Sequence, residues 1–339
     1  MSPPEIPPPD ALDVDILIVG AGPTGLYGAY YAGFRGLRTA VLDALPEPGG
    51  QITAMYPEKQ IFDIAGLPAV RGRDLVANLL DQAAPFQPVY LLGQQALGLS
   101  YDDGRPVVST SAGVSVRAGA VVITGGIGTF TPRPLAGGST YENHGLSYFV
   151  RQLDDYANHD VVIVGGGDSA FDWAATLEPL ARSVTLVHRR DRFRAHHATV
   201  TQVQASSVEI LVNCEVTQVR GDSAVTGVDI RHLPDGSVRF RRTQRIIAAL
   251  GFTTNLGPLL DWGLEIDGRH IVVGTRMATN LPRIYAAGDI TEYPGKVRLI
   301  SVGFGEAATA VNNAATVLDP AADLFPGHST DFPSTERER

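Results

Sequence analysis

The chain of 339 residues is poor in cysteine, and it lacks long apolar runs and an excess of basic side chains. Its one cysteine, Cys214, excludes an intramolecular disulfide and a Cys-x-x-Cys motif, and it favours a reducing compartment, the cytoplasm. No run of about 18 apolar residues is present, so no membrane span is expected. The formal net charge of −9 argues against binding to nucleic acid or to a bilayer surface.

Two further features exclude other classes of protein. The first ten residues contain five prolines and no basic stretch, so we expect neither a signal peptide nor a packed element there. The adjacent His196 and His197 would point apart on a helix, so no metal site is predicted. A hydrophobic content of 44% in 339 residues is typical of a globular protein of about two domains.

A glycine-rich turn follows the first predicted strand, residues 14–19. It reads Gly20-Ala21-Gly22-Pro23-Thr24-Gly25, with the G-x-G-x-x-G spacing of a dinucleotide-binding turn. Gly20 permits the tight turn, Gly22 lets a pyrophosphate approach the backbone, and Gly25 lets the next helix pack against the strand. The start of that helix, at Thr24, offers N–H groups to phosphates.

The second predicted strand, residues 39–42, ends at Asp43, where an acidic residue can bind a ribose hydroxyl. The loop beyond it contains Gly49-Gly50-Gln51. Paired glycines allow a ligand to approach the backbone closely at Gly50, and Gln51 can form a hydrogen bond with that ligand. Tyr56 can stack on a flat ring, although composition alone favours ordinary packing in a loop.

A second turn, Gly165-Gly166-Gly167-Asp168-Ser169-Ala170, follows an apolar strand at 161–164 and again has dinucleotide spacing. We therefore expect Gly165, Gly167, Asp168 and Ser169 to contact a second dinucleotide. The next strand, 184–187, ends in a basic run rather than in an acid. Basic groups there suit a 2′-phosphate and so indicate NADPH; a solvated basic helix start and a patch of the kind that binds RNA are the alternatives. The arginines expected to bind it are Arg189, Arg190 and Arg194.

The repeated pattern predicts an α/β protein with two Rossmann-like three-layer domains, the second inserted into the first. We place the first domain at residues 12–129 and 252–339, and the second at residues 134–250. Short strands in the first domain, at 89–92, 106–110 and 114–116, indicate an antiparallel layer, and a separate buried strand is predicted at 120–124. Helices are predicted at 71–86 and 302–318. A strand that ends in Gly288-Asp289 presents a carboxylate where ligands bind in α/β sheets.

Together these motifs resemble the two-domain flavoprotein reductases of the thioredoxin-reductase type, which carry FAD on the outer domain and NADPH on the inserted one. Such proteins have a Cys-x-x-Cys pair before the second turn. Phe149 and Gln152 stand there in this chain, so disulfide exchange is not expected. The chain is similar to the ferredoxin–NADP⁺ reductases built on this scaffold. The similar segments are 56–59, 165–173, 188–196, 303–307 and 328–330.

The resemblance implies FAD contacts at seven positions: Asp43, Gln51, Tyr56, Leu97, Phe130, Asp289 and Thr330. It further implies that Tyr56 stacks on one flavin face and His328 on the other. No side chain is expected to act as a catalytic residue, because the flavin carries out the redox chemistry. Family members are homodimers, and the C-terminal tail would cover the flavin of its own or of the partner subunit.

The function implied is electron transfer between NADPH and ferredoxin through FAD. Two alternatives remain at the level of sequence. One is a different NADPH flavoenzyme on the same scaffold, which reduces a quinone, a flavin or a small disulfide. The other is a flavin-binding redox sensor without turnover.

Overall fold

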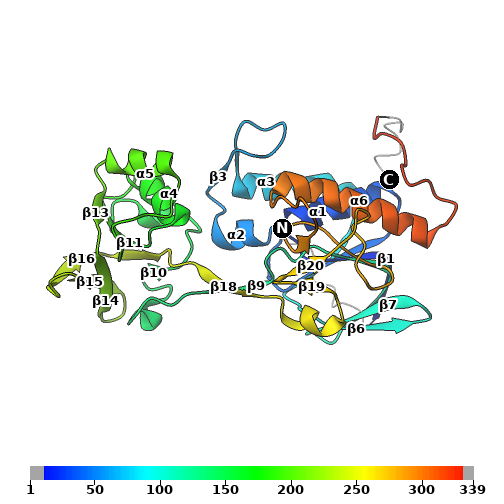
Figure 1. Cartoon of the computed structure of the whole chain (residues 1–339), viewed down its shortest axis with the longest axis horizontal. Coiled ribbons are helices and arrows are strands. Elements are labelled where there is room, and N and C mark those ends of the chain that lie inside the picture. Colours follow the sequence, from blue (N-terminus) through cyan, green and yellow to red (C-terminus); the bar gives the residue numbers. More distant parts are fainter. Residues whose placement is uncertain (1–10, 331–339) are drawn as a thin grey trace. The chain divides into compact units, whose positions relative to one another are not determined.

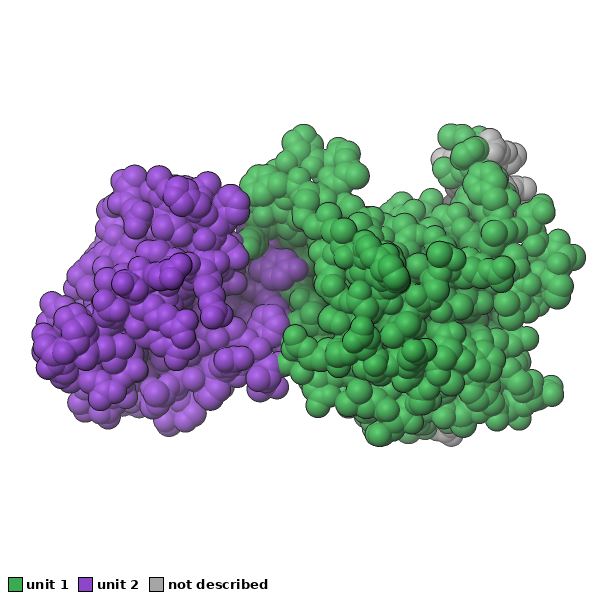
Figure 2. All heavy atoms as spheres, viewed as in Figure 1, with its two compact units in different colours: residues 1–54, 59–129, 254–339 green, residues 55–58, 130–253 purple. Residues whose placement is uncertain are grey.

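The computed structural model describes residues 11–330, so the expectation for the first ten residues lies outside the described part of the chain. The chain forms two compact units (Figures 1 and 2). Unit 1, green in Figure 2, comprises residues 1–54, 59–129 and 254–339, and unit 2, purple, comprises residues 55–58 and 130–253. The chain passes between the units through β9 (Thr129–Pro132) and β18 (Phe252–Asn255), which pair with each other.

Unit 1 is built on a seven-stranded sheet in which β1 lies between two parallel neighbours. Its residues Ile16, Leu17 and Ile18 are fully buried, as expected for a strand covered on both faces. The parallel part of the sheet consists of β5 (Val89–Leu92), β2 (Thr39–Asp43), β1 (Ala11–Val19), β8 (Ser115–Ile123) and β21 (Ile284–Ala286).

The antiparallel part of this sheet differs from the prediction. Two separate strands at 114–116 and 120–124 were expected, and this was wrong, because β8 is one continuous strand. Its first half pairs with β7 (Arg105–Thr110), which pairs with β6 (Ala96–Asp102), and its second half pairs with β21. A side chain at Gly119, between the halves, would lie 2.7 Å from the Asp15 carbonyl oxygen, so glycine allows β8 to continue there.

Helices α1 (Pro23–Phe34), α3 (Gly72–Ala83) and α6 (Ile300–Leu318) lie together in unit 1, with α1 packed against both of the others (Figure 1). No helix in residues 11–330 is both long and apolar enough to cross a membrane. The smaller elements of unit 1 are α2 (Gln51–Met55), β3 (Gln60–Ile61), β4 (Val70–Arg71), η1 (Ala84–Phe86), η4 (Gly257–Trp262), β19 (Ile266–Asp267), β20 (His270–Val272) and β22 (Thr291–Glu292).

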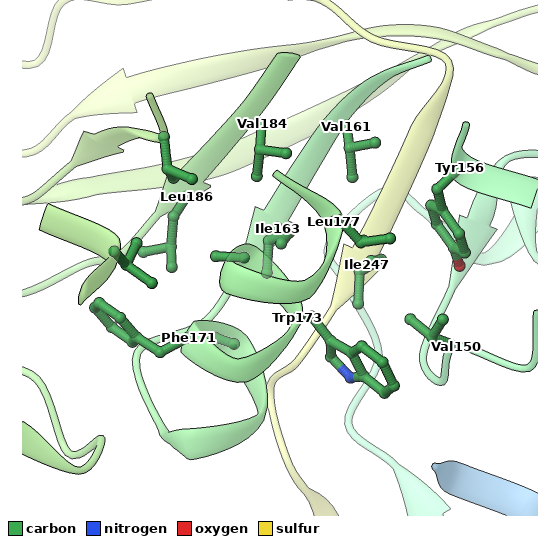
Figure 3. Close-up of a cluster of buried hydrophobic side chains, with 14 residues drawn as sticks. Val150, Tyr156, Val161, Ile163, Phe171, Trp173, Leu177, Val184, Leu186 and Ile247 are labelled. Atoms are coloured by element: carbon green, nitrogen blue, oxygen red, sulfur yellow. The ribbon is translucent and has the colours of Figure 1, made fainter. Parts of the chain in front are cut away.

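Unit 2 contains a parallel five-stranded sheet with a helical layer on one face. Figure 3 shows Phe171 and Leu177 of α4 packed beside Ile163 of the sheet, within a cluster of buried side chains. The strands, in sheet order, are β10 (Leu146–Ser147), β17 (Arg245–Ala248), β11 (Asp160–Val164), β12 (Ser183–Val187) and β13 (Glu209–Leu211), and the helices are α4 (Asp168–Leu177) and α5 (His197–Gln204).

A second buried cluster joins Val162 and Val164 of β11 to an antiparallel meander. Because successive side chains of a strand alternate between faces, β11 supplies Val161 and Ile163 to one cluster and these two valines to the other. The meander consists of β14 (Cys214–Gly221), β15 (Val225–His232) and β16 (Val238–Arg242), and the remaining turns are η2 (Ser139–Tyr141) and η3 (Asp154–Tyr156).

Candidate functional site

The first glycine-rich turn of unit 1 connects β1 to α1 in a way that depends on its glycines. Gly20 has φ +120°, and a Cβ there would lie 2.5 Å from the Thr124 carbonyl oxygen. A Cβ at Gly25 would overlap the Gly20 carbonyl and lie 2.7 Å from Thr124 Oγ1. Nothing lies within 4 Å of the corresponding point at Gly22, which precedes α1. The space beside Gly22 is therefore available to a phosphate at the helix N-terminus.

Asp43, at the end of β2, points back at this turn. Its Oδ2 accepts the N–H of Ala21 at 2.5 Å, and its Oδ1 accepts the N–H of Leu45 at 2.8 Å. Burial raises the pKa of the Asp43 carboxyl, while these two N–H groups lower it. Each oxygen retains a lone pair. The carboxylate can therefore bind the turn and still accept a hydrogen bond from a ligand hydroxyl.

The Gly49-Gly50-Gln51 loop closes onto the same turn. The N–H of Gly49 donates to the Ala21 carbonyl at 2.8 Å, and both glycines have positive φ, +108° and +57°. A Cβ at Gly50 would lie 3.0 Å from Gly22 Cα, and one at Gly126 would lie 2.9 Å from Gln51 Nε2. The structure thus brings Gly22 beside Gly50 and Gln51. One ligand could therefore contact both loops.

The Gly288–Asp289 turn packs against the start of α1, beside the first glycine-rich turn. A Cβ at Gly288 would lie 2.9 Å from Thr24 Oγ1, and one at Gly303 of α6 would lie 2.4 Å from the same atom. The starts of α1 and α6 and the end of β21 therefore converge. Asp289 is partly buried, and burial raises its carboxyl pKa, whereas Lys296 lowers it.

Three expected FAD contacts lie elsewhere in the chain. Tyr56 belongs to unit 2, where it packs against the cluster of Figure 3. Phe130 also belongs to unit 2, with its ring 6.0 Å from that of Phe149 and 6.1 Å from that of Phe252. Leu97 lies on β6, 41% exposed, and its carbonyl accepts the indole N–H of Trp262 at 3.0 Å. Their contacts with a flavin remain predictions.

The C-terminal tail lies at the far end of α1 from the glycine-rich turn. The Arg35 guanidinium, directly after α1, donates to the carbonyls of Asp323 and Leu324 at 2.9 and 3.2 Å. His328 is exposed and stacks edge-on with Phe325 at 5.1 Å, and Thr330 is exposed at the end of the described residues. Since α1 has 12 residues and is about 18 Å long, residues 323 and 324 lie at the end of α1 that is remote from the turn, and the flavin contacts of His328 and Thr330 stay predictions.

The second turn, in unit 2, has the same construction as the first. A Cβ at Gly165 would lie 2.5 Å from the Ala249 carbonyl oxygen, whereas nothing lies within 4 Å at Gly167. The basic run folds back onto this turn, because the N–H of Arg194 donates to the Gly166 carbonyl at 2.8 Å. Asp168 accepts the N–H of His196 at 2.8 Å. Ser169, Arg189, Arg190 and Arg194 are exposed.

His188 is a site residue that the sequence reasoning did not identify. Its ring occupies the place that a side chain at Gly166 would take, so the imidazole packs directly against the turn. Burial lowers the pKa of His188; a hydrogen bond to the Arg192 carbonyl opposes this, and the neighbouring arginines lower the pKa further. The sequence could have indicated His188 by its position directly after β12 and directly before the two arginines.

No dithiol accompanies either turn. Cys214 is buried in β14, among the apolar side chains beneath the meander, and burial raises the pKa of its thiol. Phe149 and Gln152 occupy the segment before β11. Disulfide exchange needs a pair of thiols, and this chain has none beside either dinucleotide turn.

Comparison with known proteins agrees with this arrangement. The model of the pyridine nucleotide-disulphide oxidoreductase family matches residues 14–314. A ferredoxin–NADP reductase of Salinispora arenicola is 65% identical over 319 residues, which is 94% of this chain and 99% of that protein. One from Halalkalibacterium halodurans is 46% identical over 321 residues, 94% of this chain and 97% of that protein. The crystal structure of T. acidophilum thioredoxin reductase superposes with a TM-score of 0.75 at 27% identity, over 90% of this chain and 98% of that one.

The thioredoxin-reductase-like fold and the long family match lead to one conclusion. This chain belongs to the pyridine nucleotide-disulphide oxidoreductase family.

Proposed function

We propose that this chain is a ferredoxin–NADP reductase, an oxidoreductase that transfers electrons between NADPH and ferredoxin through FAD. The observation that carries the proposal is the near full-length similarity to proteins of that name, at 65% identity, in a chain with two dinucleotide turns and a single cysteine. Bound FAD would supply the chemistry: its ring exchanges a hydride with nicotinamide and single electrons with an iron–sulfur centre.

We assign FAD to unit 1 and NADPH to unit 2, with the domain limits expected above. The residues of unit 1 fit FAD, because the point beside Gly22 is open and the Asp43 carboxylate stands at the end of β2. The residues of unit 2 fit NADPH, because exposed Arg189 and Arg190 follow β12. A guanidinium matches phosphate oxygens with two parallel hydrogen bonds.

We further propose a cytoplasmic homodimer in which the tail of one subunit covers the flavin of the other. The support for this is the start of the tail, which Arg35 binds at the end of α1 that is remote from the turn. A half-buried row of aromatic rings on α1 and α6 offers a contact face, with Tyr27 and Phe304 5.1 Å apart. A two-fold axis that sets α1 antiparallel to its copy would place each tail beside the partner's turn.

NADPH-dependent cytochrome c reduction tests the activity. The expected result is a slow rate with enzyme alone and a large increase when purified ferredoxin is added. An unchanged rate, together with rapid reduction of a quinone, free flavin or small disulfide, would instead indicate the other NADPH flavoenzyme.

A further inference from the structure

A charged pair is buried beside the Gly288–Asp289 turn of unit 1. The side chains of Lys296 and Glu306 are 1% and 5% exposed, and Lys296 Nζ donates to Glu306 Oε1 at 2.5 Å. The hydroxyl of Tyr293 donates to the same oxygen at 2.5 Å. A buried pair of this kind gives little net stability, because desolvation of two charges offsets their attraction. Beyond this ion pair, both side chains form hydrogen bonds with the backbone of the adjacent turn.

The pair binds both backbone polar groups of Gly288. Glu306 Oε2 accepts the N–H of Gly288 at 2.7 Å, and Lys296 Nζ donates to the Gly288 carbonyl at 3.0 Å. That carbonyl also accepts from the N–H and the hydroxyl of Thr291, at 3.1 and 2.8 Å, which closes a four-residue turn. Asp289 occupies the second position of this turn, so the direction of its carboxylate depends on how Gly288 is held.

The surroundings leave the turn little freedom to move away. Gly288 has φ +83° and is packed against Thr24 at the start of α1, and Thr24 is in turn packed against Gly303 of α6. Glu306 lies one helical turn after Gly303, so α6 carries both the close contact and the carboxylate. Burial and the Glu306 carboxylate raise the pKa of Tyr293 to about 12, so its hydroxyl remains a donor at neutral pH.

We propose that Lys296, Glu306 and Tyr293 are positioning residues of the FAD site, which hold the Gly288–Thr291 turn and thereby direct Asp289 toward the bound dinucleotide. This inference rests on the proposed binding of FAD to unit 1. Glu306 and Lys296 act through the N–H and the carbonyl of Gly288, and Tyr293 acts through Glu306; together they set the affinity for FAD and the orientation in which it is held.

The test uses full-length protein stripped of flavin and titrated with FAD. In the double variant Lys296→Met/Glu306→Leu, apolar side chains replace the pair, which is tolerated in many buried sites. We expect it to fold with a lowered melting temperature and to bind FAD at least about tenfold more weakly, because the Gly288 N–H and the Tyr293 hydroxyl lose a charged acceptor. The visible circular dichroism of the flavin that does bind should also change.

Tyr293→Phe is the milder variant, and it decides the matter if the double variant does not fold. Loss of one hydrogen bond in the network should weaken FAD binding by about two- to tenfold. Arg105→Met is the matched control, since it breaks the Arg105–Asp13 ion pair elsewhere in unit 1 and should leave FAD binding unchanged.

Two negative results have different meanings. If wild-type protein binds no FAD, the proposed function itself fails. Suppose instead that wild-type protein binds FAD. If the folded double variant then matches it in affinity and in circular dichroism, the network is only structural and the inference is overturned. Where the double variant is unfolded, the same result for Tyr293→Phe overturns the inference.

Discussion

At the scale of single residues, Asp160 of unit 2 is held by the densest set of charge-assisted hydrogen bonds on β11. Its Oδ1 accepts from Arg182 Nε and from Ser183 Oγ, each at 2.8 Å, and its Oδ2 accepts from Arg182 as well. The Arg182 guanidinium and the Ser183 hydroxyl hold the pKa of this carboxyl far below its usual range, against the opposing effect of burial.

A depressed folded-state pKa makes stability depend on pH in one direction. The Asp160 carboxylate contributes stability above its unfolded pKa of 3.8, and the contribution is lost as pH falls from there through the folded-state value. Because Arg182 is largely exposed, we expect Asp160→Asn to cost only about 1–2 kcal/mol at pH 7, and less at pH 3. Denaturant unfolding at both pH values measures this, with exposed Asp222→Asn as the control. An equal cost at both pH values would contradict the assignment.

Arg189 and Arg190 carry the prediction of nucleotide choice. Replacing both with glutamine should raise KM for NADPH by at least about 10- to 100-fold and leave KM for NADH nearly unchanged, since one phosphate-paired guanidinium is worth roughly 1.5–3 kcal/mol. Ferricyanide reduction measures both constants without ferredoxin. Arg239→Gln, which removes an exposed arginine from β16, is the matched control. Equal losses for NADPH and NADH would refute a role in 2′-phosphate binding.

At the scale of elements, the β1–turn–α1 unit separates two roles of glycine. Gly22→Ala meets open space and keeps an ordinary φ of −69°, so the apoprotein should retain its stability within about 0.5 kcal/mol. Gly25→Ala would drive a methyl group into the Gly20 carbonyl, and we expect it to cost about 1–3 kcal/mol.

FAD titration of the two apoproteins completes this comparison. Gly22→Ala should bind FAD at least about tenfold more weakly, because the methyl group occupies the approach of the pyrophosphate. Unchanged FAD affinity in a stable Gly22→Ala variant would mean that the dinucleotide does not bind at this turn.

The tail gives a second prediction at this scale. Truncation after Pro326 should keep or quicken flavin reduction by NADPH and increase the reaction of reduced flavin with oxygen, because a stacked ring shields the flavin and blocks nicotinamide. Stopped-flow reduction without oxygen, followed by mixing with oxygen, measures both rates. His328→Ala in the full-length chain separates the imidazole from the rest of the tail. Identical rates in all three proteins would remove His328 from the site.

Local patterns predicted most elements and their ends. The strand at 89–92 was placed correctly, because alternation and flanking turn residues are visible in a short window. The continuity of β8 was not predicted, since Arg117 and Gly119 interrupt its apolar pattern, and it depends on the packing of Leu318 and Asp15. Strand β6 was missed, because Leu97, which is exposed, and the neighbouring Gly98 break the alternation expected for a strand.

At the scale of the whole molecule, local motifs located the two turns but not the residues that distant segments bring to them. Asp43 binds the N–H of Ala21 and Gly50 lies beside Gly22, and both could be found because each follows a recognisable strand or turn. The Lys296–Glu306 pair was missed, because its members lie on a loop and on a helix and only the fold pairs them. Contacts group Tyr56 and Phe130 with unit 2, and the flavin contacts that the resemblance implies for them stay predictions.

Anaerobic stopped-flow spectroscopy of the full-length, FAD-loaded protein tests the central claim most directly. Mixing with NADPH should bleach the flavin absorbance, and mixing the reduced protein with oxidised ferredoxin should restore it, faster than a quinone, free flavin or a small disulfide does. A flavin that NADPH does not bleach would contradict turnover and indicate a redox sensor. A reduced flavin that ferredoxin cannot reoxidise would contradict electron transfer between NADPH and ferredoxin.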